Sequence, residues 1–179
     1  MVSIVLLRGP SAVGKTTIAN ELLLKLKKEN LVNCAFISED NFRKQMQFKY
    51  KATDKQAHIN SGVIIFDVIN RLLELDNYEV IIIDGLFRYK ETIDEYIKFC
   101  SKNNYEFLLF QLHAPREIRQ KRDQAGGIRD HYVGLNEKPK IFNGEEEHYK
   151  YSKVIDTTKT IKESTSQIIH YIMKGRFVK

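Results

Sequence analysis

Short runs of apolar residues recur along the chain and are separated by longer stretches with apolar residues every three or four positions. Such runs predict buried strands, and the stretches predict helices with one buried face. The expected strands are about 2–7, 33–38, 79–84, 106–112 and 154–155. The first expected helix ends at about residue 29, and a short second one begins near residue 40. Four more are expected over 54–75, 91–102, 115–122 and 161–173. This alternation predicts an α/β protein with a parallel sheet covered by helices on both faces.

Two of these elements carry distinct patterns. The run Val80–Ile83 is wholly β-branched, which is typical of a strand buried on both faces of its sheet. The long helix over 54–75 is expected to pack through an apolar stripe at helical spacing. That stripe consists of Val63, Phe66, Ile69, Leu72 and Leu73.

Residues 9–16 read GPSAVGKT, a complete G-x-x-x-x-G-K-T motif between the first strand and the first helix. In that context the backbone N–H groups of the loop point at phosphate oxygens, at the positive end of a helix dipole. Lys15 reaches the β- and γ-phosphates, and the Thr16 hydroxyl holds Mg²⁺. A chance glycine-rich turn would not need the strand and the helix. The predicted nucleotide-binding residues are Gly9, Ser11, Ala12, Val13, Gly14, Lys15, Thr16 and Thr17.

Polar residues follow the second and third strands, where ligands of open α/β sheets bind. Asp40 is a candidate general base for an acceptor hydroxyl and equally a candidate helix N-cap, and the two roles are compatible. Arg43 would share a helical face with Asp40 and bind an anionic group of the acceptor, or be a solvated charge. Asp84 ends an apolar strand and is expected to orient Mg²⁺ with Thr16, and Arg88 is expected to line the acceptor pocket.

The segment at about 123–151 contains four of the nine glycines and mixed charge. A loop of this length in a compact domain is typical of a lid, here over bound phosphates, and a surface loop is the alternative. Arg122 and Arg129 are expected to stabilise charge on the transferring phosphoryl group. Arg119, in contrast, is expected on a basic surface helix.

Composition limits the possible classes of protein. The 179 residues, 42% of them hydrophobic, predict a single domain over 1–179. No apolar run is long enough to span a membrane, and the two cysteines, Cys34 and Cys100, are expected to be reduced core thiols in a cytoplasmic protein. The net charge of +6 suits an anionic ligand, and no basic-aromatic track favours nucleic acid.

The chain resembles P-loop phosphotransferases of the small kinase group, which include adenylylsulfate, zeta-toxin-like and polynucleotide kinases. Four segments carry the resemblance: GPSAVGKTT at 9–17, SEDNFRKQM at 38–46, VIIIDGLFR at 80–88 and LHAPREIRQKRD at 112–123. The resemblance implies a P-loop NTPase three-layer sandwich, with five parallel strands in the order 2-3-1-4-5 and a lid segment that begins at Arg122. It also implies that Asp40 orients the hydroxyl and that Arg43 binds the acceptor.

The sequence therefore predicts an ATP- and Mg²⁺-dependent kinase that moves the γ-phosphate of ATP to a hydroxyl of a small molecule or nucleotide-type acceptor. GTPase motifs such as Asn-Lys-x-Asp are missing, which favours ATP. The alternatives are a polynucleotide 5′-hydroxyl kinase and an ATP-binding switch protein that transfers no phosphate. The sequence names neither the acceptor nor the oligomeric state.

Overall fold

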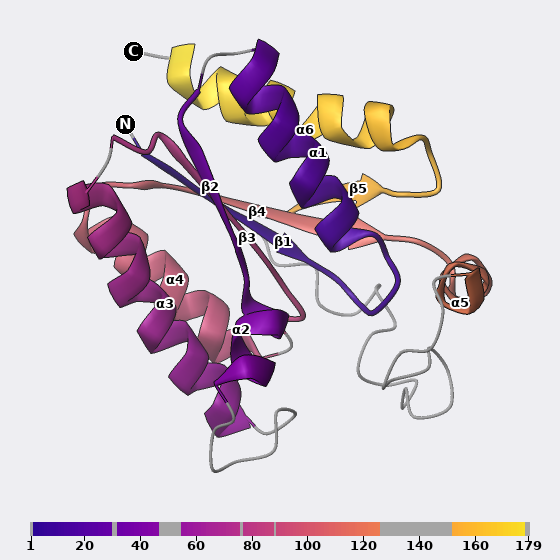
Figure 1. The fold of residues 1–179 in the computed structure, drawn as a ribbon, viewed down its shortest axis with the longest axis horizontal. Coiled ribbons are helices and arrows are strands. Elements are labelled where there is room, and N and C mark those ends of the chain that lie inside the picture. The colour runs from indigo at the N-terminus through magenta and orange to yellow at the C-terminus, as the bar shows by residue number, and fades with distance from the viewer. Residues whose placement is uncertain are drawn as a thin grey trace.

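The structure is a computed structural model, and it describes residues 2–29, 32–46, 55–75, 77–87, 89–125 and 152–177. Within these residues five parallel strands form one sheet in the order β2-β3-β1-β4-β5 (Figure 1). The strands are β1 (Ser3–Arg8), β2 (Cys34–Ser38), β3 (Val80–Gly85), β4 (Glu106–His113) and β5 (Lys153–Asp156). The helices are α1 (Lys15–Glu29), α2 (Glu39–Gln45), α3 (Lys55–Leu75), α4 (Lys90–Lys102), α5 (Arg116–Ala125) and α6 (Ile161–Phe177). The predicted α/β architecture and strand order are confirmed.

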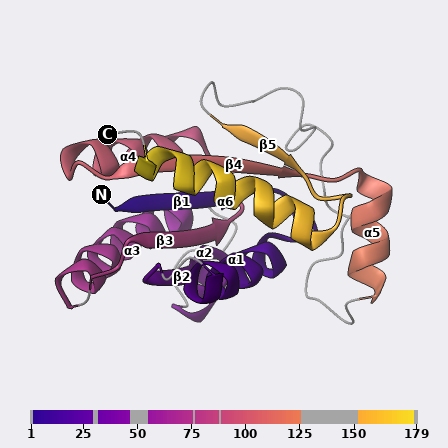
Figure 2. The same ribbon diagram turned by 90° about the horizontal axis from the view of Figure 1, so that it is seen from above.

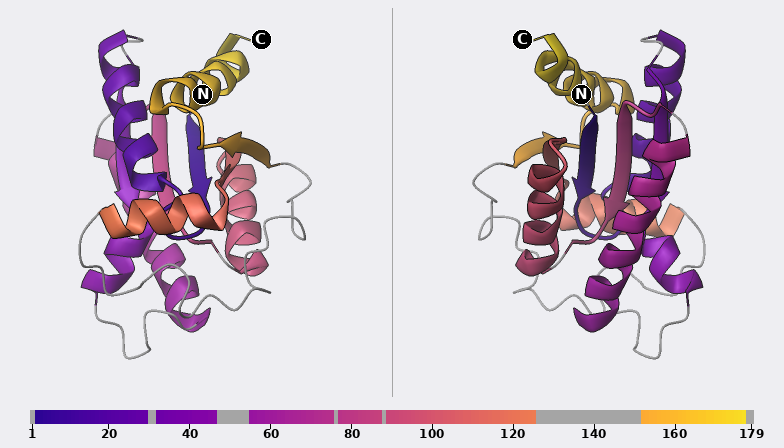
Figure 3. Two further views of the ribbon diagram at one scale, coloured as in Figure 1. Left: turned by 90° about the vertical axis from the view of Figure 1, so that its right-hand side faces the viewer. Right: turned by 90° about the vertical axis from the view of Figure 1, so that its left-hand side faces the viewer.

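Helices cover both faces of the sheet. Helices α1 and α6 lie over one face and α3 and α4 over the other, while α5 runs across the strand ends (Figures 1 and 3). Each face has its own apolar cluster, one holding Leu22 and Ile168 from α1 and α6, the other Ile65 and Tyr96 from α3 and α4. These two layers of packing fix the sheet that carries the site.

Strand β1 is the centre of the sheet and pairs with β3 on one side and β4 on the other (Figure 2). In this register Arg8, the last residue of β1, lies between Gly85 and Gln111. All six residues of β3 are buried, as the β-branched run predicts for a strand covered on both faces. The loop that follows β1 therefore starts from the most shielded position of the sheet.

Helix α3 packs through most of the expected apolar stripe and also through small and polar residues that the prediction did not include. Ile69 is buried, and Phe66 and Leu73 are partly buried against the core. The buried residues of α3 are Ala57, His58, Ser61, Gly62, Ile65 and Ile69. Val63 is 54% exposed because it lies two residues, or about 200°, from Ser61 and Ile65 around the helix. Small and polar residues thus make up four of the six buried positions of α3, and a search for large apolar residues alone misses them.

The remaining predictions on the fold have mixed outcomes. Cys34 and Cys100 are buried free thiols, as expected. Helix α5 extends to Ala125, three residues beyond the predicted end, so it includes the first residues assigned to the lid. The rest of the predicted lid, 126–151, lies outside the described residues. None of the described helices is both long and apolar enough to pass through a membrane.

Candidate nucleotide and phosphoryl-transfer site

The loop between β1 and α1 needs its glycines for two different reasons. A Cβ on Gly9 would lie 2.9 Å from the Leu112 carbonyl oxygen and 2.9 Å from Cγ1 of Val13. Gly14 has open space around it, but its φ of +101° is one that side chains rarely allow. Ala12 is also left-handed, with φ of 58°. The loop backbone is therefore held in a special conformation at the N-terminus of α1, where anions bind.

The Lys15 side chain lies inside this loop. Its Nζ donates to the carbonyl oxygens of Gly9 at 2.9 Å and Pro10 at 3.3 Å, and lies 3.8 Å from Oδ2 of Asp40. Burial lowers the pKa of Lys15, and the carboxylates of Asp40, Asp84 and Glu39 oppose that shift. A buried ammonium held by neutral carbonyls is well suited to bind phosphate oxygens.

Thr16 and Asp84 meet at the foot of the loop. The Thr16 hydroxyl donates to Oδ2 of Asp84 at 2.6 Å. The Asp84 carboxylate is buried, and its Oδ1 has no hydrogen-bond partner among the described residues. Burial raises the pKa of Asp84, while the hydroxyls of Thr16 and Ser38 and the charge of Lys15 oppose the rise. A hydroxyl and a carboxylate with a vacant buried oxygen are donors that suit Mg²⁺ and its bound water.

Asp40 faces Lys15 from the first turn of α2. The helix begins at Glu39 with Ser38 at the N-cap position, and no side chain caps it. The N-cap interpretation of Asp40 is therefore wrong, because the helix starts one residue before it. Asp40 is 31% exposed, and its Oδ1 accepts a hydrogen bond from Nη2 of Arg43 at 3.0 Å.

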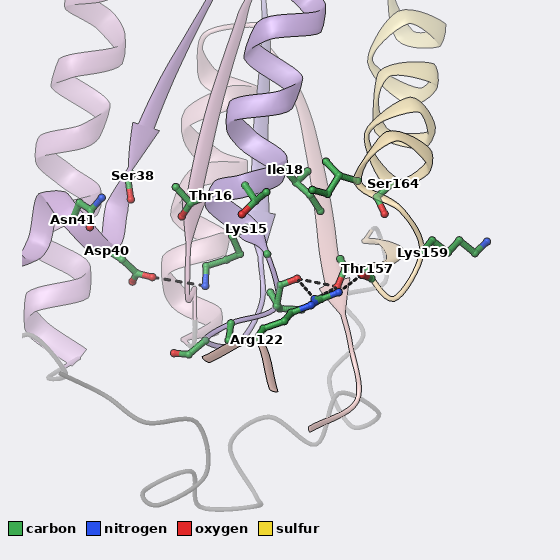
Figure 4. Close-up of a pocket in the computed structure, with 16 residues that line it drawn as sticks. Lys15, Thr16, Ile18, Ser38, Asp40, Asn41, Arg122, Thr157, Lys159 and Ser164 are labelled. Carbon is green, nitrogen blue, oxygen red and sulfur yellow. Dashed lines mark hydrogen bonds and ion pairs between the residues drawn. The ribbon is translucent and has the colours of Figure 1, made fainter. Parts of the chain in front are cut away.

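A cavity of about 690 Å³ connects these groups (Figure 4). Lys15 points toward Asp40 at one side of the cavity, and Arg122 points toward Thr157 at the other. Sixteen residues line the cavity: Ser11, Ala12, Val13, Gly14, Lys15, Thr16, Thr17, Ile18, Ser38, Asp40, Asn41, Arg122, Thr157, Lys159, Ile161 and Ser164. Of the eight predicted nucleotide-binding residues, all but Gly9 line it, and Gly9 supports the loop from behind.

A family profile described as an AAA domain matches residues 4–131, which is more than half of the chain. The chain belongs to this AAA domain family. The sequence matches none of the curated proteins with which it was compared.

Solved structures similar to this AAA domain include several kinases. Adenylylsulfate (APS) kinase CysC of Mycobacterium tuberculosis, in complex with AMPPNP and APS, aligns with a TM-score of 0.72 at 16% identity, over 97% of this chain and 98% of its own. A gluconokinase from Sinorhizobium meliloti 1021 aligns at 0.67 and 11% identity, over 97% and 92%. The protein APE1195 aligns at 0.68 and 22%, over 99% and 97%. At these identities the likeness shows a shared fold.

Arg122 of the AAA domain ties the phosphate loop to the segment after β5. Its Nη1 donates to the Val13 carbonyl oxygen and to Oγ1 of Thr157, each at 3.2 Å, and its Nη2 donates to the Thr157 carbonyl oxygen. The Thr157 hydroxyl in turn donates to the Val13 carbonyl oxygen at 2.8 Å. Arg122 therefore lies at the cavity next to the phosphate loop, and its role in stabilising charge on the phosphoryl group stays a prediction.

The connection after β5 and the first turn of α6 supply cavity residues that were not predicted from the sequence. They are Thr157 and Lys159 from the connection and Ile161 and Ser164 from α6. The rule that ligands bind beyond the carboxyl ends of strands applies to β5 as to the other strands. Applied there, it would have identified the residues directly after Asp156. The expected strand at 154–155 lies within β5, but the predicted site did not include the residues after it.

Arg119 is not on the surface, contrary to the prediction. Its side chain is buried, with Nε donating to the Ala114 carbonyl oxygen at 3.3 Å and Nη1 to that of Ser11 at 3.4 Å. Because α5 crosses the strand ends, the inner side of this polar helix faces the phosphate loop rather than solvent (Figure 3). The predicted sites Arg88 and Arg129 lie outside the described residues.

Proposed function

We propose that this protein is an ATP-dependent phosphotransferase that moves the γ-phosphate of ATP to a hydroxyl group of a small-molecule or nucleotide-type acceptor. One observation carries the proposal. A carboxylate from a separate element, Asp40 of α2, lies 3.8 Å from the ammonium of the loop lysine, Lys15. The loop N–H groups, Lys15 and Mg²⁺ suffice to hold a triphosphate, whereas an attacking hydroxyl requires a carboxylate beside the terminal phosphate.

The described side chains divide the work between donor and acceptor. Lys15 leaves the carbonyl oxygens of Gly9 and Pro10 and binds the β- and γ-phosphates, to which the N–H groups of the loop also point. Asp40 accepts the proton of the acceptor hydroxyl as that oxygen attacks the γ-phosphorus in line with the leaving ADP oxygen.

Thr16 and Asp84 would hold Mg²⁺, directly or through its water, because the vacant Oδ1 of Asp84 is a ready oxygen ligand. The ion neutralises charge on the β- and γ-phosphates when bound. Arg122 is placed at the nucleotide cavity to stabilise negative charge there, and Arg129 is proposed to join it from the lid.

The similar solved structures support this proposal by their shape alone. Two of them are named as kinases of small molecules, APS and gluconate, and they match this chain over almost its full length. The family description, AAA domain, fits nucleotide binding and leaves the acceptor open. Oligonucleotides with a 5′-hydroxyl therefore belong in the test, as does a reaction in which ATP is hydrolysed without an acceptor.

The experiment is a screen of hydroxyl compounds and 5′-hydroxyl oligonucleotides for ATP consumption, followed by the Asp40→Asn variant with the best acceptor. We expect calorimetry with Mg²⁺ and AMPPNP to give similar affinities for parent and variant, while transfer falls at least about a hundredfold, as for loss of a general base. Asp67→Asn, the same change on the exposed side of α3, is the control.

Two results would contradict the proposal. Slow hydrolysis that no acceptor accelerates would indicate a switch protein instead. Full transfer by the Asp40→Asn variant would remove Asp40 from the reaction even if the protein is a kinase.

A further inference from the structure

Four polar side chains form a buried cluster next to Asp40. Glu39 and Arg43 come from α2 and His58 and Ser61 from α3, and they are 1%, 7%, 2% and 0% exposed. None of the four lines the nucleotide cavity, and the function proposed above uses none of them. Burying the Glu39 carboxylate costs free energy unless it is paired with a cation and hydrogen-bonded, so its partners indicate its role.

Arg43 stands at the centre of this cluster and has most of its donors engaged. Its Nη1 donates to Glu39 at 2.9 Å and 3.1 Å, one distance for each carboxylate oxygen, and lies 2.9 Å from Nδ1 of His58. Its Nη2 donates to Oδ1 of Asp40 at 3.0 Å. Nη1 has two hydrogens, and this arrangement uses both. One guanidinium therefore joins a buried carboxylate to the carboxylate at the cavity.

Helix α3 fixes the far end of the cluster. The Ser61 hydroxyl donates to Oε1 of Glu39 at 2.8 Å. Nδ1 of His58 must accept from Arg43, because a guanidinium has only donors, so the neutral ring carries its hydrogen on Nε2. Glu39 also packs closely, since a Cβ on Gly85 would lie 3.0 Å from its Oε2. The carboxylate of Glu39 is thus held from α3 and from the end of β3.

We propose that Glu39, Arg43, His58 and Ser61 form a buried relay that fixes the Asp40 carboxylate beside Lys15, and that Arg43 is a positioning residue rather than an acceptor ligand. Arg43 is buried and does not line the cavity, so its guanidinium would have to move to reach an acceptor there. Such a movement takes Nη1 away from Glu39 and leaves that buried carboxylate without its cation, which is strongly unfavourable. With Oδ1 of Asp40 held by Arg43, Oδ2 is the oxygen that faces Lys15 and accepts the hydroxyl proton. This last step rests on the proposed function.

The first test uses Mg²⁺ and ATP with water as the only acceptor. If Arg43 positions Asp40, the Arg43→Lys variant, which keeps the charge and loses the fork, hydrolyses ATP about a hundredfold more slowly, as expected for misplacing a reacting group by about 1 Å. The loss is absent when Arg43→Lys is added to Asp40→Asn, because nothing remains to be positioned. If Arg43 binds the acceptor instead, hydrolysis by Arg43→Lys stays at the parent rate and the proposal is overturned.

Substitutions of Glu39 and Ser61 test the same proposal, because they alter the relay and leave Asp40 and Lys15 unchanged. Glu39→Gln keeps the shape of the side chain and removes its charge, and Ser61→Ala removes one hydrogen bond from Glu39 as a milder change that is expected to fold. Both are expected to slow hydrolysis with unchanged affinity for Mg²⁺ and AMPPNP. Glu91→Gln is the matched control, because Glu91 pairs with Lys55 on the exposed surface. Equal rates for Ser61→Ala, Glu39→Gln and the control would contradict the relay.

A second measurement tests whether the relay holds Arg43 in place, and it does so even if the protein proves not to be a phosphotransferase. Arginine side-chain NMR of the free protein is expected to show separate Nη proton signals for Arg43, because its fork is pinned by Glu39, His58 and Asp40. These signals merge in Glu39→Gln and remain separate in Glu91→Gln. Merged signals in the parent protein would overturn the relay. A parent protein with separate signals that neither binds AMPPNP nor turns over ATP would overturn the proposed function alone.

Discussion

Replacing Thr157 with valine tests whether the contact between the phosphate loop and the β5–α6 segment holds the nucleotide cavity together. Valine keeps the shape of threonine and removes the hydroxyl. That hydroxyl lies 2.8 Å from the Val13 carbonyl oxygen and 3.0 Å from that of His113, and it accepts from Arg122 at 3.2 Å. The side chain is buried, so water does not replace these bonds.

The expected size of the effect follows from what remains bonded in the Thr157→Val protein. The Val13 carbonyl keeps the hydrogen bond from Arg122, and the His113 carbonyl keeps the one from the Thr157 backbone N–H at 2.8 Å. Neither acceptor is left without a partner. The cost is therefore that of a made hydrogen bond, about 1 kcal/mol, rather than the larger penalty for an unsatisfied buried group.

Thermal unfolding measures this cost directly. In a protein of this size about 1 kcal/mol lowers Tm by roughly 2–4 °C. If binding of Mg²⁺ and ATP loses the same free energy, the affinity falls about fivefold. Thr157→Ser, which keeps the hydroxyl, is expected to restore the affinity. An unchanged Tm in Thr157→Val, or an equal loss of affinity in the valine and serine variants, would refute this reasoning.

Three further outcomes are expected. Burial raises the pKa of Asp84 above its ordinary value of 3.8, so the folded state favours the protonated carboxyl group, and the stability that this gives is lost as pH rises from about 3.8 through the folded pKa. In Mg²⁺-free buffer the Tm of the Asp84→Asn protein should therefore rise relative to that of the parent as pH increases through this range. A constant difference in Tm would contradict this. Gly14→Ala should destabilise the protein by about 1–3 kcal/mol through backbone strain alone, and Gly9→Ala by a similar amount through overlap with Leu112. Both variants should bind AMPPNP more weakly. Calorimetry that shows the parent affinity in both would count against the loop geometry. Burial raises the pKa of the Cys100 thiol to about 12, so a thiol reagent should label it only as fast as the protein unfolds, and immediate labelling of the native protein would show that the thiol is accessible.

The parts of the site that could be predicted from the sequence are those built from contiguous residues or from residues at the ends of long strands. The motif at 9–16 determines its own loop, and Asp40 and Asp84 follow strands whose patterns are clear. Parallel pairing then brings these positions to one edge of the sheet, so their proximity follows from the fold class.

Other parts depend on how the helices are turned, which the sequence pattern does not determine. Arg119 and Glu39 are charged residues on helices with no apolar stripe near them, and each is buried because of what lies opposite: the carbonyl of Ser11 for Arg119 and the guanidinium of Arg43 for Glu39. A charge that is buried by its partner has the same appearance in a sequence as a charge in solvent. Val63 shows the converse, an apolar residue on the exposed side of α3.

The order of the strands has a consequence for how such a protein changes over evolutionary time. The phosphate loop follows β1 and Asp84 lies near the end of β3, both in the interior of the sheet, whereas Asp40 follows β2 at one edge. Substitutions, insertions or a different helix after an edge strand disturb one neighbouring strand only. If the protein transfers phosphate as proposed, the side of the site that follows β2 can therefore diversify while the phosphate loop after β1 stays constant.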